Sequence, residues 1–227
     1  MANKQLILPK TDEEGKYYIS YSQISKWKRS KRDYMRSYFM GEKDDNKALQ
    51  IYGDFGTKVG ESYENNDFSA WEDDEAEFLK SLPHLDEFER KIKLQMDGYY
   101  VLGFIDTNSK PVNVGSTNCY VEELADYKTG EIDKRTPEYE SDDYWQVDIY
   151  AAALQQCYGR YPDKGSVVLI GRSGNAFAGE ELNLVKEAAI INRPISKERC
   201  DSVLSQVHEI AEEISDYYKI YLKLNSL

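Results

Sequence analysis

The chain of 227 residues carries a formal net charge of −12, and 41% of its residues are hydrophobic. This length and this globular composition are typical of one domain of mixed class with room for a sizeable core. The net negative charge argues against nucleic-acid binding by the surface as a whole, because phosphate contacts need cations.

The cysteines and the apolar runs indicate where the protein works. No run of about 18 apolar residues occurs, so we expect no membrane span. The N-terminus has an apolar run of only three residues, which is too short for a secretory signal. Cys119, Cys157 and Cys200 show neither a disulfide pattern nor a CxxC pair. We therefore expect a reducing cytoplasm.

The first predicted helix covers residues 22–41, with Ser22 as its N-cap and Gly41 as its stop. It interleaves cations with aromatic residues: Lys26, Lys28, Arg29, Lys31, Arg32 and Arg36 with Trp27, Tyr34, Tyr38 and Phe39. Such a pattern suits a surface on which bases stack and phosphates pair. The alternative is an ordinary amphipathic helix with a solvated basic face.

The second predicted helix covers residues 49–67 and contains Gly56 and Gly60. Each interior glycine costs roughly 1 kcal/mol relative to alanine, so close packing or substrate approach would explain them. Residues 69–88 are acidic and helical in parts.

The pattern then changes to strands. Residues 89–108 alternate apolar and polar in two runs around Asp97-Gly98, which is a strong hairpin signal. The remaining predicted elements are a strand at 119–130, a helix at 141–159, strands at 164–173 and 185–196, and a closing helix at 196–223. This order indicates an α/β fold with a mixed central β-sheet flanked by helices. We expect a single domain over residues 1–227, with an N-terminal helical portion (about 18–95) and a core (about 96–227).

Two carboxylates and a lysine stand near strand ends. Asp106 closes the run VLGFID, and Asp126 lies in the strand that we expect beside it. Two adjacent carboxylates repel each other unless they are protonated or bridged by a cation such as Mg²⁺. Lys128 shares a face with Asp126, because residues i and i+2 of a strand point the same way. The alternatives are a solvated edge pair for Asp126 and Lys128, and a turn-forming role for Asp106.

The next helix offers a second set of candidates. Gln146 and Tyr150 are four residues apart and share a helix face. Across a short connection that face points back at the preceding strand, where an amide and a phenol could hold Lys128 or contact a substrate.

The motifs GFID, ADYKTG and QVDIY, in this order and spacing, resemble the PD-(D/E)XK nuclease superfamily. More narrowly they resemble its RecB-type branch, which includes CRISPR-associated and phage exonucleases. The Ser-rich start before the first helix is also similar to that branch. The resemblance covers residues 18–161 and implies a restriction-endonuclease-like core.

The resemblance assigns roles to individual residues. Asp106 and Asp126 would be metal ligands together with the Tyr127 carbonyl, and Lys128 would be the catalytic lysine. Gln146 and Tyr150 would position the substrate. The basic residues Lys28, Arg29, Lys31 and Arg32 would then contact DNA. The implied cofactor is Mg²⁺ or Mn²⁺.

The sequence departs from the family at two places. The segment FGTKVGESYE has Gly60 where the family's metal-binding histidine stands. Either Glu61, or Glu64 one turn on, takes that place, or one metal position is weakened. Several relatives also hold an iron–sulfur cluster on four cysteines, and three cysteines cannot supply it. We therefore expect no cluster.

The resulting expectation is a metal-dependent deoxyribonuclease, an exonuclease of DNA recombination, repair or processing in a bacterial or phage-infected cell. Its partners would be single-stranded DNA or duplex ends, and a helicase or a single-strand annealing protein. The alternatives are a non-catalytic nucleic-acid-binding or assembly subunit that keeps the fold, and an RNA or small-molecule phosphodiesterase.

Overall fold

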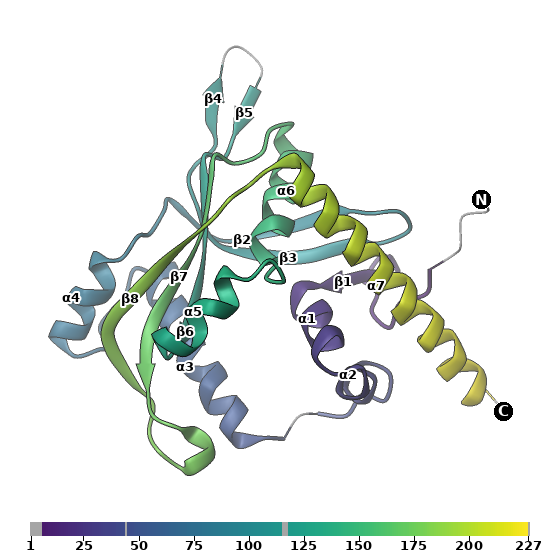
Figure 1. The fold of residues 1–227 in the computed structure, drawn as a ribbon, viewed down its shortest axis with the longest axis horizontal. Coiled ribbons are helices and arrows are strands. Elements are labelled where there is room, and N and C mark those ends of the chain that lie inside the picture. Colours follow the sequence, from purple (N-terminus) through teal and green to yellow (C-terminus); the bar gives the residue numbers. More distant parts are fainter. Residues whose placement is uncertain (1–5, 44, 115–117, 227) are drawn as a thin grey trace. The chain divides into compact units, whose positions relative to one another are not determined.

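The computed structural model describes residues 6–43, 45–114 and 118–226 (Figure 1). In chain order the elements are β1 (Tyr18–Ser20), α1 (Tyr21–Arg29), α2 (Lys31–Tyr38), α3 (Lys47–Glu64), α4 (Asp73–Ser81), β2 (Glu87–Gln95), β3 (Tyr100–Asn108), β4 (Val112–Val114), β5 (Asn118–Tyr120), β6 (Glu123–Gly130), α5 (Ile132–Glu140), α6 (Gln146–Tyr158), β7 (Lys164–Ser173), the 3₁₀-helix η1 (Ala176–Ala178), β8 (Asn183–Arg193) and α7 (Lys197–Leu224).

The strands form a mixed sheet in the order β1–β3–β6–β7–β8, and β2 pairs with β3 as well. The β1–β3 and β6–β7 pairs are parallel, whereas β3–β6 and β7–β8 are antiparallel. Helices flank the sheet, which confirms the predicted α/β class. None of the described helices is both long and apolar enough to cross a membrane.

The chain divides into two compact units that interleave along the sequence. The first unit holds residues 1–44, 91–103 and 197–227, and the second holds residues 45–90 and 104–196. The predicted single domain with a boundary near residue 95 stays a prediction.

In the first unit, the predicted helix over residues 22–41 is two helices, so that prediction was wrong. Ser30 ends α1 in an extended conformation (φ −159°, ψ 99°), and its hydroxyl accepts a hydrogen bond from the Asp33 amide at the start of α2. The N-cap of α1 is Ser20 rather than Ser22, since the Ser20 hydroxyl accepts from the Gln23 amide. A serine inside a basic amphipathic run can thus be a cap as readily as a helical residue.

The aromatic residues of α1 and α2 form the core of the first unit. Trp27 and Tyr34 are fully buried, with their rings edge to face at 5.0 Å, and Phe39 is buried beside them. The Trp27 indole donates to Glu213 of α7 at 2.8 Å. The interpretation of these three rings as a base-stacking surface was therefore wrong, because they face inward.

In the second unit, β7 is the central strand of the core. Its residues 167–170 are fully buried between β6 on one side and β8 on the other. Tyr63 of α3 stacks on Tyr127 of β6 with ring centroids 4.4 Å apart. The packing of α3 over β6 places one helix directly above the strand that carries the candidate site.

The structure contains two features that the sequence analysis did not include. Helix α5 follows β6 at once, and the Arg135 side chain folds onto Gly130, where a Cβ atom would lie 2.7 Å from it. The predicted strand over 119–130 is broken after Tyr120, so that β5 pairs with β4 in a separate two-stranded ribbon and β6 alone joins the main sheet.

Candidate active site

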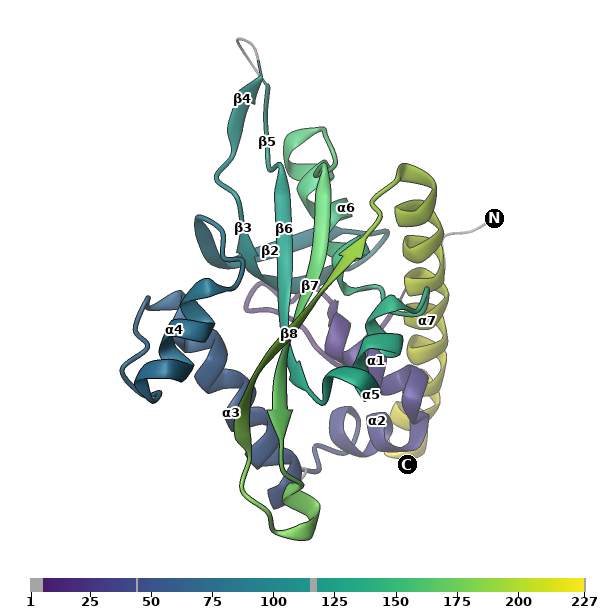
Figure 2. The ribbon, with the colours of Figure 1, turned by 60° about the vertical axis from the view of Figure 1, so that its left-hand side comes forward.

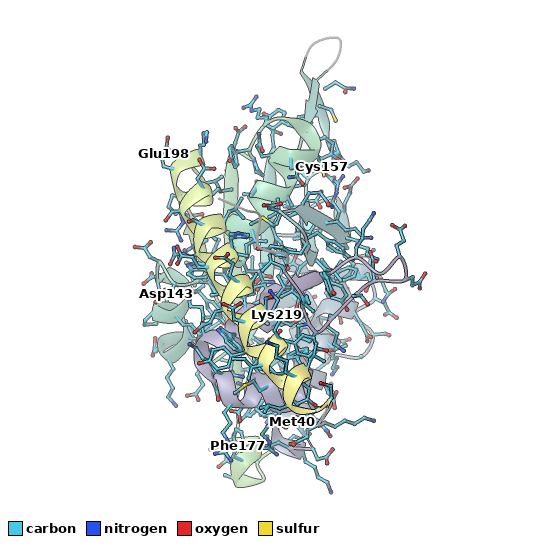
Figure 3. All side chains as sticks on the ribbon, turned by 90° about the vertical axis from the view of Figure 1, so that its right-hand side faces the viewer. Met40, Asp143, Cys157, Phe177, Glu198 and Lys219 are labelled. Atoms are coloured by element: carbon cyan, nitrogen blue, oxygen red, sulfur yellow. The ribbon has the colours of Figure 1, made fainter. Side chains whose placement is uncertain are left out.

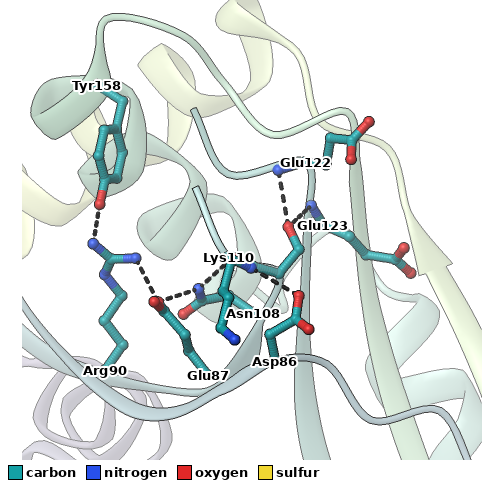
Figure 4. A network of polar contacts seen from close by, with 9 residues as sticks. Asp86, Glu87, Arg90, Asn108, Lys110, Glu122, Glu123 and Tyr158 are labelled. Carbon is teal, nitrogen blue, oxygen red and sulfur yellow. Dashed lines mark hydrogen bonds and ion pairs between the residues drawn. The ribbon is translucent and has the colours of Figure 1, made fainter. Parts of the chain in front are cut away.

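Asp106 lies in the part of β3 that belongs to the second unit, and polar contacts hold the end of this strand. The Asn108 amide donates to Glu87 at 3.0 Å, and Arg90 donates to the same carboxylate at 3.0 Å (Figure 4). Arg90 also donates to the hydroxyl of Tyr158 on α6. These contacts tie β2, β3 and α6 together two residues beyond Asp106, so the position of its carboxyl group is restrained.

Asp126 and Lys128 share one face of β6, as the strand spacing predicts. The Lys128 Nζ lies 2.5 Å from Asp126 Oδ2. Asp126 is completely buried, whereas the Lys128 side chain keeps 26% of its exposure. The pair is therefore not a solvated edge pair, because Asp126 is buried and only Lys128 is partly accessible to solvent.

The structure brings Asp106 to this pair. β3 and β6 pair antiparallel with Thr107 opposite Ala125, so Asp106 and Asp126 are the next residues along the two neighbouring strands. Asp106 Oδ2 accepts a hydrogen bond from the Tyr127 amide at 2.8 Å. Burial and then the charge of Asp126 raise the pKa of Asp106 to about 7. Without a cation, Asp106 therefore holds its proton at a higher pH than an ordinary aspartate does.

Lys128 stays charged in this setting. Its burial alone would lower its pKa, but the carboxylates of Asp126 and Asp106 outweigh that effect and raise the pKa above the usual value of lysine. The ammonium group also donates to the Tyr127 carbonyl at 3.3 Å. The carbonyl predicted as a metal ligand therefore faces the same cluster of groups.

A hydrogen-bonded chain extends from Asp126 to α6. The Tyr144 hydroxyl lies 2.7 Å from Asp126 Oδ2 and 3.1 Å from Gln146 Oε1, and Gln146 Nε2 donates to the Tyr150 hydroxyl at 2.7 Å. Burial and then the nearby Asp126 raise the pKa of Tyr150, so this phenol is neutral. Gln146 and Tyr150 therefore do face the strand, as expected, but they reach Asp126 through a tyrosine that the sequence analysis passed over.

Tyr144 is held in place by a residue of β8, the strand at the end of the sheet order. Arg193, at the end of β8, is buried and donates to the main-chain carbonyls of Tyr139 and Tyr144 at 2.6 and 3.1 Å. The Tyr144 and Tyr139 rings also pack edge to face at 5.1 Å. No regular spacing links residues 139, 144 and 193 in the sequence, so no motif indicates this support.

The donor set fits a hard divalent cation. Asp126 Oδ1 is fully buried and has no hydrogen-bond partner among the described residues, which is costly for a carboxylate oxygen. Asp106 accepts a hydrogen bond from the amide of Tyr127, the residue next to Asp126, so the two aspartates lie on neighbouring strands at the same level of the sheet. Mg²⁺ takes one or two carboxylates and completes its shell with water and phosphate oxygens. Among the described residues no group of three or more acidic, His or Cys side chains is gathered for a metal, so any cation here would rest on the two aspartates.

The acids at and near α3 have different surroundings. Glu61 is exposed, and so is Glu64 one turn on. A further carboxylate, Glu89 of β2, carries a charge that adds to the raised pKa of Asp106. Burial and then the charge of Glu64 raise the pKa of Glu89 itself. Glu89 has a positive φ of 48°, a strained conformation for a residue with a side chain. No sequence pattern indicates Glu89, whose left-handed backbone conformation sets it apart from its neighbours in the strand.

The predicted DNA contacts lie in the first unit. Lys28, Arg29, Lys31 and Arg32 are all exposed. Lys31 pairs with Glu213 of α7, which raises the pKa of Lys31. These residues share an accessible basic face, and their contact with DNA stays a prediction, as does the absence of an iron–sulfur cluster.

A solved structure has a fold similar to that of this chain. No protein-family model matches the chain, and no curated protein matches its sequence. Among solved structures, the chain is similar to the crystal structure of a "putative exonuclease" from Eubacterium rectale, with a TM-score of 0.50 and 13% sequence identity. The likeness covers 94% of this chain and 87% of the other. The two proteins share a fold. At this identity the likeness establishes nothing beyond the fold.

Proposed function

We propose that this protein is a divalent-metal-dependent deoxyribonuclease of the PD-(D/E)XK type. The observation that carries the proposal is the convergence of Asp106, Asp126 and Lys128, with one buried oxygen of Asp126 left without a partner. A structural site would satisfy that oxygen with a protein donor. An unsatisfied acceptor beside a second carboxylate and a charged lysine instead supports a site completed by a cation and a phosphate.

Each residue has a chemical task in this proposal. Asp106 and Asp126 would hold Mg²⁺ or Mn²⁺, and the bound ion would neutralise the phosphate and lower the pKa of water. Lys128, charged and partly exposed, would orient the attacking water and stabilise the negative charge that develops on the phosphate. Tyr144 fixes one oxygen of Asp126, so the other oxygen is left for the ion. Gln146 and Tyr150 would contact the substrate backbone next to this site.

Three observations support DNA and an exonucleolytic reaction. The structural neighbour is described as a "putative exonuclease", and the motifs GFID, ADYKTG and QVDIY occur in the order of the RecB-type branch. The exposed cations of α1 and α2 supply a surface that suits phosphates, although the chain as a whole is acidic. A helicase or a single-strand annealing protein would be a suitable partner, and the bacterial or phage-infected cytoplasm a suitable location.

The proposal is tested with end-labelled single-stranded DNA, end-labelled duplex DNA and closed circles, each with and without Mn²⁺. We expect degradation of the linear substrates only, and only with the metal. Asp126→Asn and Lys128→Ala should each abolish it, and Lys134→Ala, which removes an exposed lysine of α5, should not. Cleavage that survives in both site variants would refute the assignment. Faster cleavage of RNA would move the proposal to a ribonuclease.

A second candidate function is favoured by Gly60. Gly60 stands where the family has a histidine and has no side chain to bind a metal. Unless Glu61 or Glu64 takes that place, the proposed ligands among the described residues are two aspartates and a carbonyl. The chain could therefore be a nucleic-acid-binding or assembly subunit without efficient chemistry. Calorimetric titration of Mn²⁺ distinguishes the two functions. A site that is lost in Asp106→Ala supports the nuclease, and no binding at millimolar metal supports the subunit.

A further inference from the structure

A groove separate from the candidate active site opens in the second unit. It has a volume of about 600 Å³ and lies between α3, the start of α4, and the turn that joins η1 to β8. Figure 2 shows α3 and α4 on one side of β8, with the η1 turn at the lower end of that strand. Its lining residues are Ile51, Asp54, Phe55, Lys58, Trp71, Glu75, Ala176, Gly179, Glu180, Glu181, Leu182, Asn183 and Leu184. None of them belongs to the proposed nuclease chemistry.

The groove has a fixed apolar floor. The Trp71 indole donates to the Ser62 hydroxyl at 2.8 Å, and its ring packs edge to face with Phe55 at 5.8 Å. Leu184 continues the floor along β8. Trp71 is largely buried and hydrogen-bonded at its only polar atom, so the part of its ring that lines the groove is held in one orientation.

Carboxylates from three elements line the walls. Asp54 comes from α3, Glu75 from α4, and Glu180 and Glu181 from the turn before β8. Among the described lining residues Lys58 is the only cation, and its Nζ lies 3.7 Å from the centre of the Trp71 ring. The Trp71 ring therefore already binds an ammonium group. The four carboxylates outnumber this single cation, so the groove keeps a net negative charge.

One wall of the groove is the start of an edge strand. Among the described residues, β8 pairs with β7 and with no other strand, and it is the last strand in the sheet order. The first residues of β8, Asn183 and Leu184, line the groove. An edge strand offers main-chain donors and acceptors to an added segment, whose alternate side chains then enter a neighbouring pocket. The exposed Phe177, which Figure 3 places on the projecting turn next to β8, adds apolar surface at the same end.

We propose that this groove is a docking site for an extended segment of a partner protein in which lysine or arginine alternates with apolar residues. The apolar side chains would lie on Trp71 and Leu184, and the cations would meet the four carboxylates. The same carboxylates repel phosphates, so the groove is not part of a DNA path. The proposal is independent of the nuclease function, since it requires no residue of the candidate active site.

The test uses a short fluorescein-labelled peptide that alternates lysine and leucine, followed by fluorescence anisotropy and by the indole signals of the ¹⁵N-labelled protein. We expect saturable binding and a shift of the Trp71 indole signal, which Trp71→Phe identifies. Glu180→Lys together with Glu181→Lys should weaken binding at least about tenfold. Asp133→Lys together with Glu140→Lys is the charge-matched control, because both acids are exposed on α5 away from the groove. This control should change the affinity little.

The intramolecular cation offers a second comparison. Lys58→Ala should tighten binding, because it vacates the Trp71 ring, whereas Lys80→Ala removes the same charge elsewhere and should not. Several results would overturn the proposal. Binding of a peptide that alternates lysine and glycine as tightly as the lysine–leucine peptide would mean that the apolar side chains play no part. Equal loss of binding in the two double variants, or a shift of the Trp71 signal by spermine alone, would make the effect one of charge only. A dimer of the chain that Glu180→Lys abolishes would make a second copy the occupant of the groove. The absence of any indole shift at millimolar peptide would overturn it as well.

Discussion

The hydroxyl of Tyr144 lies 2.7 Å from Asp126 Oδ2, the same oxygen that the Lys128 ammonium approaches at 2.5 Å. A phenol has a single proton to donate, and its distance to Gln146 Oε1 is longer, at 3.1 Å. The carboxylate therefore takes the stronger bond. With two donors on Oδ2 and none on Oδ1, the Asp126 carboxylate is fixed in one orientation.

Tyr144→Phe removes this bond and keeps the ring. A hydrogen bond to a charged group contributes about 1.5–3 kcal/mol, so we expect the turnover number to fall by about tenfold to a hundredfold while KM for DNA changes less. Steady-state nuclease assays at saturating Mn²⁺ measure both. Tyr120→Phe is the matched control, because Tyr120 donates to Asp163 at 2.9 Å outside the site. Equal effects of the two substitutions would mean that Tyr144 has only a structural role.

Asp106→Asn should stabilise the metal-free protein at high pH. The folded pKa of about 7 is above the usual value near 3.9, so the folded state holds the proton more tightly than the unfolded chain. The stability contributed by this proton is complete below pH 4 and is lost as the pH rises through 7. Since Asp106 is only half-buried, we expect the variant to exceed the wild type by about 1–3 kcal/mol at pH 8, and by much less at pH 5.

Urea unfolding with a chelator at both pH values measures this difference. Addition of Mn²⁺ should stabilise the wild type and leave Asp106→Asn unchanged, because the variant lacks one of the two carboxylates. A wild type that is more stable than the variant at pH 8 without metal would show that the two aspartates do not repel each other.

Gly60 can accept a side chain. It lies inside α3, its φ is not positive, and a Cβ atom there would meet nothing within 4 Å. Gly60→Ala should therefore raise the free energy of unfolding by about 0.5–1 kcal/mol. Gly60→His should raise Mn²⁺ affinity beyond Gly60→Ala if the helix faces the metal as the family resemblance implies. Thermal unfolding and calorimetry give the two values, and equal affinities would remove residue 60 from the metal site.

The basic face of α1 and α2 should contribute to DNA affinity through charge. Replacing Lys28, Arg29, Lys31 and Arg32 with glutamine should weaken DNA binding regardless of sequence, and reduce the slope of log K against log salt by roughly 1 per lost phosphate contact. A control variant with glutamine at exposed lysines elsewhere has the same net charge; suitable positions are Lys43, Lys110, Lys134 and Lys164. An equal salt slope in the two variants would make the basic face an ordinary solvated surface.

Local patterns predicted most of the strands and the residues on them. The hairpin at Asp97-Gly98 is present, with Gly98 at φ +81° between β2 and β3, because only this turn chemistry suits the conformation. The i and i+2 spacing placed Asp126 and Lys128 on one face, and the i and i+4 spacing joined Gln146 to Tyr150. In each case the geometry is set within a few residues of the chain.

Features that depend on distant segments could not be predicted in this way. Tyr144 reaches Asp126 from a segment between two helices, and its position depends on Arg193 almost fifty residues later. The break at Ser30 depends on a capping bond that competes with helix propagation, and both outcomes suit the same sequence pattern. The left-handed conformation of Glu89 has no composition signal at all.

The strand order also has a consequence for the sequence of folding events. β7 and β8 are joined by residues 174–182 only, whereas the parallel pairing of β6 with β7 must wait until the longer segment of residues 131–163 has been looped out. We therefore expect the β7–β8 hairpin to form early and β6, which carries Asp126 and Lys128, to join it late. Pulsed hydrogen exchange during refolding should show protection of β8 amides before β6 amides, and the reverse order would contradict this. The strand that holds Asp126 and Lys128 would then become native only after the hairpin on which it packs.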